Sequence, residues 1–128
     1  MNTTALAYMG DAVYEIYVRQ HVLEKEQVHV DSIHKAAIRF VKASAQARVI
    51  KALLAADGML TDEETALVKR ARNRKTTSKP KNADPVEYKL ATAFEALLGY
   101  LYLSENAERL AEIVAYAITI TDSDNNKR

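Results

Sequence analysis

Apolar residues recur at three- and four-residue spacings along most of the chain, which is the spacing of one face of an α-helix. Only three glycines and two prolines interrupt this pattern. We therefore predict an all-α protein with helices over 4–25, 32–56, 61–72, 84–104 and 105–120. Ser44 is a candidate division point within the second of these helices.

Residues at the predicted helix starts support these boundaries. Asp31 is a suitable N-cap for the second helix, and Thr61 with Glu64 has the spacing of a capping box. Asp84 followed by Pro85 places an N-cap directly before a proline at the first helical position, where proline is favoured. Four of the residues that start these helices are thus of the types that such positions prefer.

The length of 128 residues predicts one domain, which we place at 1–121. We expect a mobile loop over 73–85, which lacks apolar periodicity, and a disordered tail over 122–128. The absence of cysteine excludes disulfides and thiolate metal sites. No uncharged apolar run approaches the ~20 residues of a membrane span, so we expect a cytoplasmic protein with no membrane partner.

Two acidic residues lie in otherwise apolar helical segments. Asp11 lies within "AYMGDAVYE" at 7–15, and Glu95 lies within "TAFEALLGYLYL" at 92–103. A carboxylate buried without a partner is costly, whereas one divalent cation neutralises two of them. Two apolar helices that each present one carboxylate could therefore form a magnesium site.

These positions also have a plainer interpretation. Asp11, Glu15 and Arg19 follow a four-residue spacing and would form a solvated row of charges along one helix. Gly10 and Gly99 would then only mark close contacts between helices. Periodicity alone favours this structural interpretation over a metal site.

Positive charge is concentrated between Lys69 and Lys81, where seven cations occur without an acid on a chain whose net charge is +1. Such a segment can neutralise phosphates, and its lack of aromatic residues argues against stacking on single-stranded bases. A solvated loop without a partner is the alternative. The candidates for contact with nucleic-acid phosphates are Arg70, Arg72, Arg74, Lys75, Lys79 and Lys81.

The two acidic motifs resemble those of the ribonuclease III family. "LAYMGDAVY" is similar to the signature Asn-Glu-Arg-Leu-Glu-Phe-Leu-Gly-Asp, and "TAFEALLGYLYL" is similar to the second motif, Asp-x-x-Glu-Ala-Leu-Ile-Gly-x-x-Tyr. Their order and their separation fit as well. The resemblance covers nearly the whole chain and is closest to the Mini-ribonuclease III branch, which consists of the catalytic domain alone.

The resemblance implies an all-α ribonuclease III catalytic fold and assigns Asp11 and Glu95 as catalytic residues that bind Mg²⁺, with Mn²⁺ as a substitute. The chain departs from the family pattern at Thr4, Ala7 and Thr92, where the motifs have acids. Fewer acidic ligands imply that a bound magnesium ion keeps more waters. The histidines, at 21, 29 and 34, are scattered and offer no competing catalytic group.

The implied activity is hydrolysis of double-stranded RNA, with maturation of the large-subunit (23S) ribosomal RNA precursor as the implied role. Tyr8 takes the place of a signature phenylalanine that enters the partner subunit, so a homodimer is implied. Two alternatives stay open. The first is a dimer that binds structured RNA without efficient cleavage, and the second is a helical protein whose basic loop meets an acidic partner.

Overall fold

The computed structural model describes residues 1–25, 29–75 and 80–126, and of residue 126 it describes the backbone only. These residues form six helices and no strand, which confirms the all-α prediction. The helices are α1 (Thr3–Glu24), α2 (Val30–Val41), α3 (Ala43–Ala55), α4 (Asp62–Asn73), α5 (Pro85–Leu103) and α6 (Ala107–Asn126). No described helix has both the length and the apolar character needed to cross a membrane.

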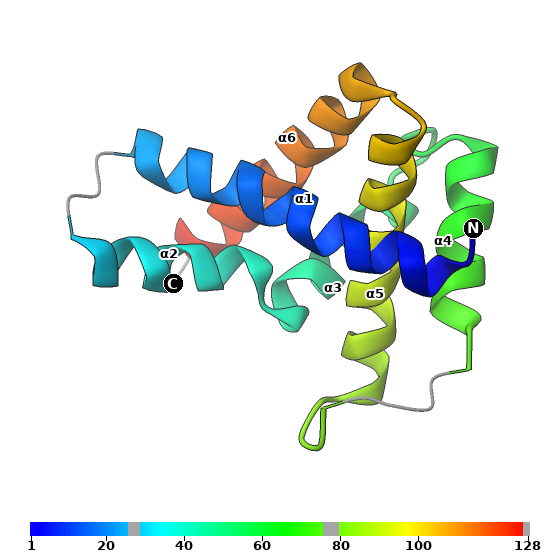
Figure 1. Ribbon diagram of the computed structural model, residues 1–128, viewed down its shortest axis with the longest axis horizontal. Coiled ribbons are helices and arrows are strands. Elements are labelled where there is room, and N and C mark those ends of the chain that lie inside the picture. Colours follow the sequence, from blue (N-terminus) through cyan, green and yellow to red (C-terminus); the bar gives the residue numbers. More distant parts are fainter. Residues whose placement is uncertain (26–28, 76–79, 127–128) are drawn as a thin grey trace.

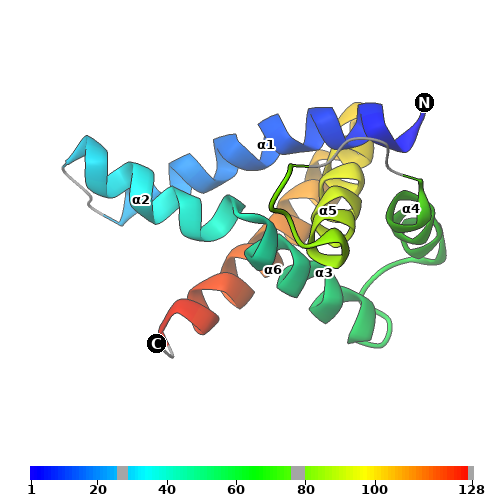
Figure 2. The ribbon, with the colours of Figure 1, turned by 90° about the horizontal axis from the view of Figure 1, so that it is seen from below.

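Helix α5 is the centre of the molecule. It contacts α1, α3, α4 and α6, and Figure 1 shows α1 crossing it. In Figure 2 the helices α2 and α4 lie on opposite sides of α5. Phe94, Leu97 and Leu98 of α5 are fully buried. The ring of Phe94 packs edge to face against the ring of Tyr14 from α1, with 4.9 Å between the ring centroids. Because α5 is surrounded in this way, its apolar sequence has room for few charges.

The predicted start signals of α4 and α5 are confirmed. Glu64 N donates to Thr61 Oγ1 at 3.1 Å, and Thr61 N donates to Glu64 Oε1 at 2.9 Å, so both bonds of the capping box are present. Asp84 Oδ1 accepts a hydrogen bond from Val86 N at 2.8 Å, with Pro85 in the first turn. These bonds satisfy backbone donors that a helix start leaves unpaired.

Helix α2 begins two residues earlier than predicted. His29 occupies its N-cap without a side-chain hydrogen bond, and Asp31 lies in the first turn. An acid is favoured there by the helix dipole, so Asp31 suits the first turn as well as the cap. The boundary between α2 and α3 falls at Lys42 rather than at Ser44. The extended backbone of Lys42 (ψ 151°) ends α2.

The prediction of a disordered tail is wrong for residues 122–126, because α6 continues to Asn126. Asp122 pairs with His21 at 2.9 Å and with Lys25 at 3.2 Å, both at the end of α1. Asp124 pairs with Arg48 of α3 at 3.1 Å. Side chains far away in the sequence therefore hold the acids of the last turns of α6. Residues 127 and 128 lie outside the described part of the chain.

Helices α1 and α5 cross at two glycines. A Cβ atom on Gly10 would lie 1.7 Å from the carbonyl oxygen of Glu95, and one on Gly99 would lie 1.9 Å from that of Leu6. Atoms cannot approach so closely, so only glycine permits this backbone contact. The crossing places Asp11, which follows Gly10, beside the turn of α5 that carries Glu95.

Candidate active site

Asp11 and Glu95 are brought together at this crossing. Asp11 is exposed, whereas Glu95 is partly buried. Burial, the negative charge of Asp11 and a hydrogen bond with Asp11 together raise the pKa of Glu95 to about 8. A like charge beside a buried carboxyl disfavours its ionised form. The pair is thus an electrostatically unfavourable one that a cation would relieve.

Gln46 is a further polar residue at this site, and sequence reasoning missed it. Its side chain is 2% exposed and reaches Glu95 from α3, where its hydrogen bond lowers the pKa of Glu95 and so opposes the effect of burial. Gln46 Nε2 also donates to the carbonyl oxygen of Val41 at 2.9 Å. Gln46 Oε1 is buried and has no hydrogen-bond partner in the described structure. Buried polar atoms are rarely left unpaired, so this oxygen calls for a ligand or a water.

The three positions that lack family acids contribute no carboxylate. Ala7 is buried, Thr4 is exposed, and Thr92 Oγ1 donates to the carbonyl oxygen of Tyr88 at 2.8 Å. The described residues contain no group of three or more His, Cys, Asp or Glu side chains placed to hold a metal. Asp11 and Glu95 are thus the two carboxylates that the described structure brings together at this crossing.

Two other acids near these motifs have structural roles. Glu15 pairs with Arg19 one turn further along α1, at 3.0 Å. This part of the plainer interpretation of the charge row on α1 is confirmed. Asp84 caps α5. Neither acid joins Asp11 in a cluster that could hold a metal, so neither extends the carboxylate pair.

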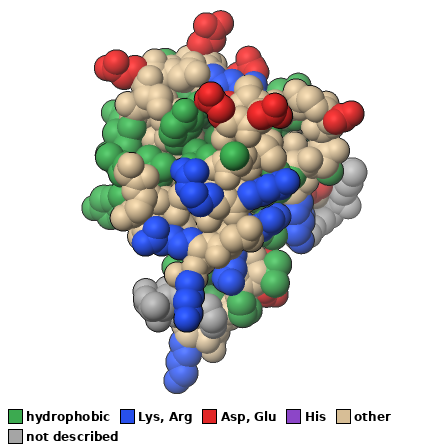
Figure 3. Space-filling model, turned by 90° about the vertical axis from the view of Figure 1, so that its right-hand side faces the viewer, with side chains coloured by type: hydrophobic (Ala, Val, Ile, Leu, Met, Phe, Trp, Pro, Cys, Tyr) green, Lys and Arg blue, Asp and Glu red, His purple; other side chains and the backbone are tan. Residues whose placement is uncertain are grey.

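Several basic side chains gather on the face shown in Figure 3, to which α4 and the start of α5 contribute. Arg70 and Arg74 are exposed at the end of α4, and Arg72 is partly buried with its Nε donating to Asn73 Oδ1 at 3.3 Å. Lys75 and Lys81 are exposed on the segments that flank the undescribed residues 76–79. Lys79 itself lies outside the described residues.

Lys89 was not predicted, because it lies outside the charged run 69–81. It is exposed on α5 and follows Pro85 by about one turn. A signal was present, since Lys89, Thr92 and Glu95 are spaced by three residues and therefore share one face of a helix. Gln46 gave no comparable signal, because nothing in the sequence links α3 to Glu95.

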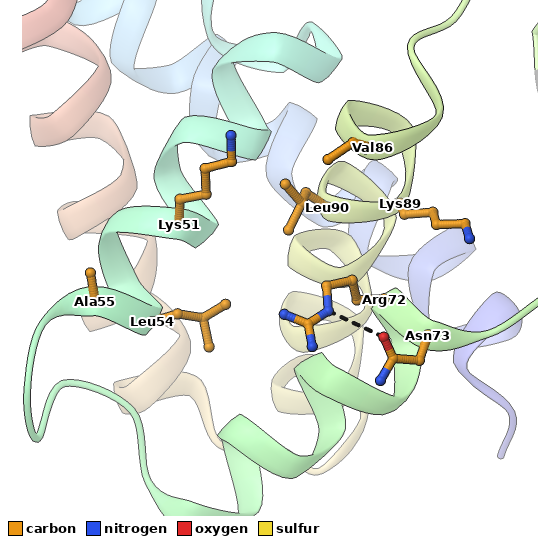
Figure 4. A pocket seen from close by; sticks show the side chains of 8 residues that line it. All are labelled: Lys51, Leu54, Ala55, Arg72, Asn73, Val86, Lys89 and Leu90. Atoms are coloured by element: carbon orange, nitrogen blue, oxygen red, sulfur yellow. Dashed lines mark hydrogen bonds between the residues drawn. The ribbon is translucent and has the colours of Figure 1, made fainter.

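A hollow lined by apolar and basic residues adjoins this basic face. It has a volume of about 690 Å³, and its apolar wall includes Leu54 and Leu90 (Figure 4). Lys51 of α3 and Arg72 of α4 border it. Lys89 of α5 also lines this hollow, and in Figure 4 its side chain extends away from Lys51 on the opposite wall.

The fold and the paired acids define a class of protein, and the comparisons agree with it. The family model of the ribonuclease III domain matches residues 4–106, and the chain belongs to the ribonuclease III family. It is an endoribonuclease of the ribonuclease III type.

Its relatives include proteins named Mini-ribonuclease 3. The one from Symbiobacterium thermophilum is 49% identical over 112 residues, which are 88% of this chain and 84% of the relative. The one from Enterococcus faecalis is 43% identical over 127 residues, which are 99% and 96% of the two chains. A crystal structure of a protein from Fusobacterium nucleatum is 30% identical and matches with a TM-score of 0.79, covering 92% of each chain.

Proposed function

We propose that the protein is a magnesium-dependent endoribonuclease that cuts double-stranded RNA as a cytoplasmic homodimer, and that it matures the large-subunit (23S) ribosomal RNA precursor. The observation that carries this proposal is the Asp11–Glu95 pair, which lies beside a basic face. The names of the relatives support the substrate class, and the family is generally metal-dependent.

The residues at the crossing fit a hard divalent cation. Asp11 and Glu95 are oxygen ligands whose mutual repulsion a cation would remove, and the unpaired Gln46 Oε1 is a suitable acceptor for a metal-bound water. Magnesium is often bound by one or two carboxylates, with waters and substrate phosphates completing its shell. Mn²⁺ accepts the same ligands.

When bound, such an ion supplies an activated water and stabilises charge on the phosphoryl group and the leaving oxygen. Asp11 and Glu95 would hold it, and Gln46 would keep the Glu95 carboxylate in position through its hydrogen bond. Such outer partners of a metal ligand typically matter 10- to 100-fold for metal affinity or activity, by order of magnitude. Neither acid acts as a covalent nucleophile in this scheme.

The basic face supports duplex RNA as substrate. Arg70, Arg74, Lys75 and Lys81 are exposed and neutralise phosphates without reading bases. Duplex RNA is recognised mainly through its shape and its backbone, which suits such residues. Arg72 and Lys79 are further candidates for this contact.

The exposed apolar residues of α1 support a homodimer. Tyr8 is 83% exposed, Ile16 68% and Leu23 57%, so an aromatic and two aliphatic side chains of one helix face solvent in a single subunit. Two-fold homodimers are the commonest oligomers, and a second copy would cover these side chains. We expect sedimentation equilibrium to give the mass of a dimer for the wild type and a shift toward the monomer for Tyr8→Ala. A monomeric wild type would contradict the homodimer.

Cleavage of a perfectly paired RNA tests the proposed activity. We expect the wild type to cut it with Mg²⁺ or Mn²⁺ and not with a chelator, and to bind it with an affinity that falls steeply with salt. Binding without metal-dependent cleavage would favour a dimer that only holds RNA. Absence of salt-sensitive binding would favour a helical interaction protein instead.

A further inference from the structure

A second pocket, of about 690 Å³, lies between the start of α1, the end of α4 and the first half of α5. Its lining includes three cations, from Arg74, Lys75 and Lys89, and no aspartate or glutamate. Thr4 and Thr92 also line it, and Tyr8 contributes to its edge. We call this pocket, defined by Thr4, Arg74, Lys75, Lys89 and Thr92, the cationic pocket.

The cationic pocket adjoins the carboxylate pair along α5. Thr92 precedes Glu95 by three residues, and Lys89 precedes Thr92 by three, so these side chains follow one face of the helix. Three residues of helix rise ~4.5 Å and six rise ~9 Å, so along the axis of α5 Thr92 lies ~4.5 Å and Lys89 ~9 Å from Glu95. The separation of successive phosphates along a nucleic-acid strand lies within this range. A strand whose phosphate lies at Glu95 would therefore bring its neighbouring phosphate to the cationic pocket.

The chemistry of the pocket suits an anion held by cations. Thr4 and Thr92 are the positions at which the chain lacks the acids of the family motifs, and acids there would repel a phosphate. The hydroxyl of Thr92 already donates to the carbonyl oxygen of Tyr88, so the donors for an anion are the cationic side chains.

We infer that the cationic pocket binds the RNA phosphate next to the scissile one, on the strand that the Asp11–Glu95 pair cuts. This inference rests on the proposed function.

The experiment pairs removal of one protein charge with removal of one phosphate charge. Binding of a short RNA duplex is measured in a chelator, so that no strand is cut, with a single uncharged methylphosphonate linkage placed in turn at each position around the cleavage site. The variants are Lys89→Gln and Lys75→Gln. Lys51→Gln is the control, because Lys51 is an exposed lysine that lines the neighbouring hollow and not the cationic pocket.

We expect the uncharged linkage next to the scissile one to weaken wild-type binding about tenfold, which is typical of a charged hydrogen bond. In Lys89→Gln or Lys75→Gln the same linkage should weaken binding much less than it does in the wild type. In Lys51→Gln it should weaken binding as much as in the wild type. Such non-additivity at one position reports direct coupling between the two groups.

Three results would overturn the inference. Additive losses at every linkage in both variants would show that these lysines act only through long-range charge. Suppose instead that Lys89→Gln shifts the monomer–dimer equilibrium and alters the effect of no particular uncharged linkage on RNA binding. The pocket would then be a contact with a second copy of the chain. Failure of the wild type to bind duplex RNA at all would remove the proposed function as well, whereas the first two results leave it standing.

Discussion

Asp11→Asn is expected to lower the rate of duplex RNA cleavage by at least ~100-fold, since even partners that only orient a metal ligand are worth 10- to 100-fold. Asparagine keeps the shape of the side chain but removes the charge that holds a cation. Asp11 is exposed, and asparagine can keep its hydrogen bond with Glu95, so the fold should lose little stability. Single-turnover cleavage and thermal unfolding measured on the same preparation check both statements.

Glu15→Gln is the matched control for this variant. Glu15 lies one turn from Asp11 on the same helix, and its partner is Arg19 rather than the carboxylate pair. Exposed ion pairs of this kind contribute ~0–1 kcal/mol, so the control should fold and cut as the wild type does. Equal cleavage rates for Asp11→Asn and the wild type would show that Asp11 is not part of the active site. Equal losses of rate in Asp11→Asn and Glu15→Gln would point to a general effect of charge on RNA binding.

The helices of this protein were predictable because their signals are local. The capping box of Thr61 and Glu64, and the Asp84–Pro85 start of α5, involve residues within three positions of one another. The end of α6 was not predictable in this way. Its last turns carry Asp122 and Asp124, whose partners His21, Lys25 and Arg48 are distant in the sequence.

The same contrast applies to the site. Asp11 and Glu95 were identified because an acid in an apolar helix is unusual, and because two motifs resembled those of one family. Gly10 and Gly99 could be interpreted only as close contacts, and the structure shows that they join the two helices at Glu95 itself. The close contact and the candidate metal site are therefore parts of one arrangement, although the sequence presented them as competing interpretations.

Gln46 and Lys89 show what pattern reasoning leaves out. A buried glutamine has no periodicity of its own, and its position against Glu95 depends on how α3 packs on α5. In the sequence Lys89 is an ordinary helical lysine. In the structure the end of α4 brings Arg74 and Lys75 to the pocket that Lys89 also lines. Both residues gain their proposed roles from packing between helices, which the sequence does not encode locally.

The affinity of the site for Mg²⁺ is expected to rise about tenfold per pH unit up to pH ~8 and to level off above it. In the metal-free protein the pKa of Glu95 is raised to about 8, so below that pH a cation must displace one proton from its carboxyl. The affinity at pH 8 should thus exceed that at pH 6 by about 50-fold, because half of the Glu95 carboxyls are ionised at pH 8 and ~1% at pH 6. Calorimetric titrations in two buffers of different ionisation enthalpy measure both the affinity and the proton released.

Glu95→Gln separates this explanation from a general effect of pH. The variant has no proton to displace at this position, so its weaker binding should show little dependence on pH. The sign for stability follows from the same pKa. Because Glu95 binds its proton more tightly in the folded than in the unfolded chain, the metal-free wild type should lose stability as pH rises from about 4.5 to about 8. Glu95→Gln should lack this loss, and an equal slope in both proteins would assign it to other groups.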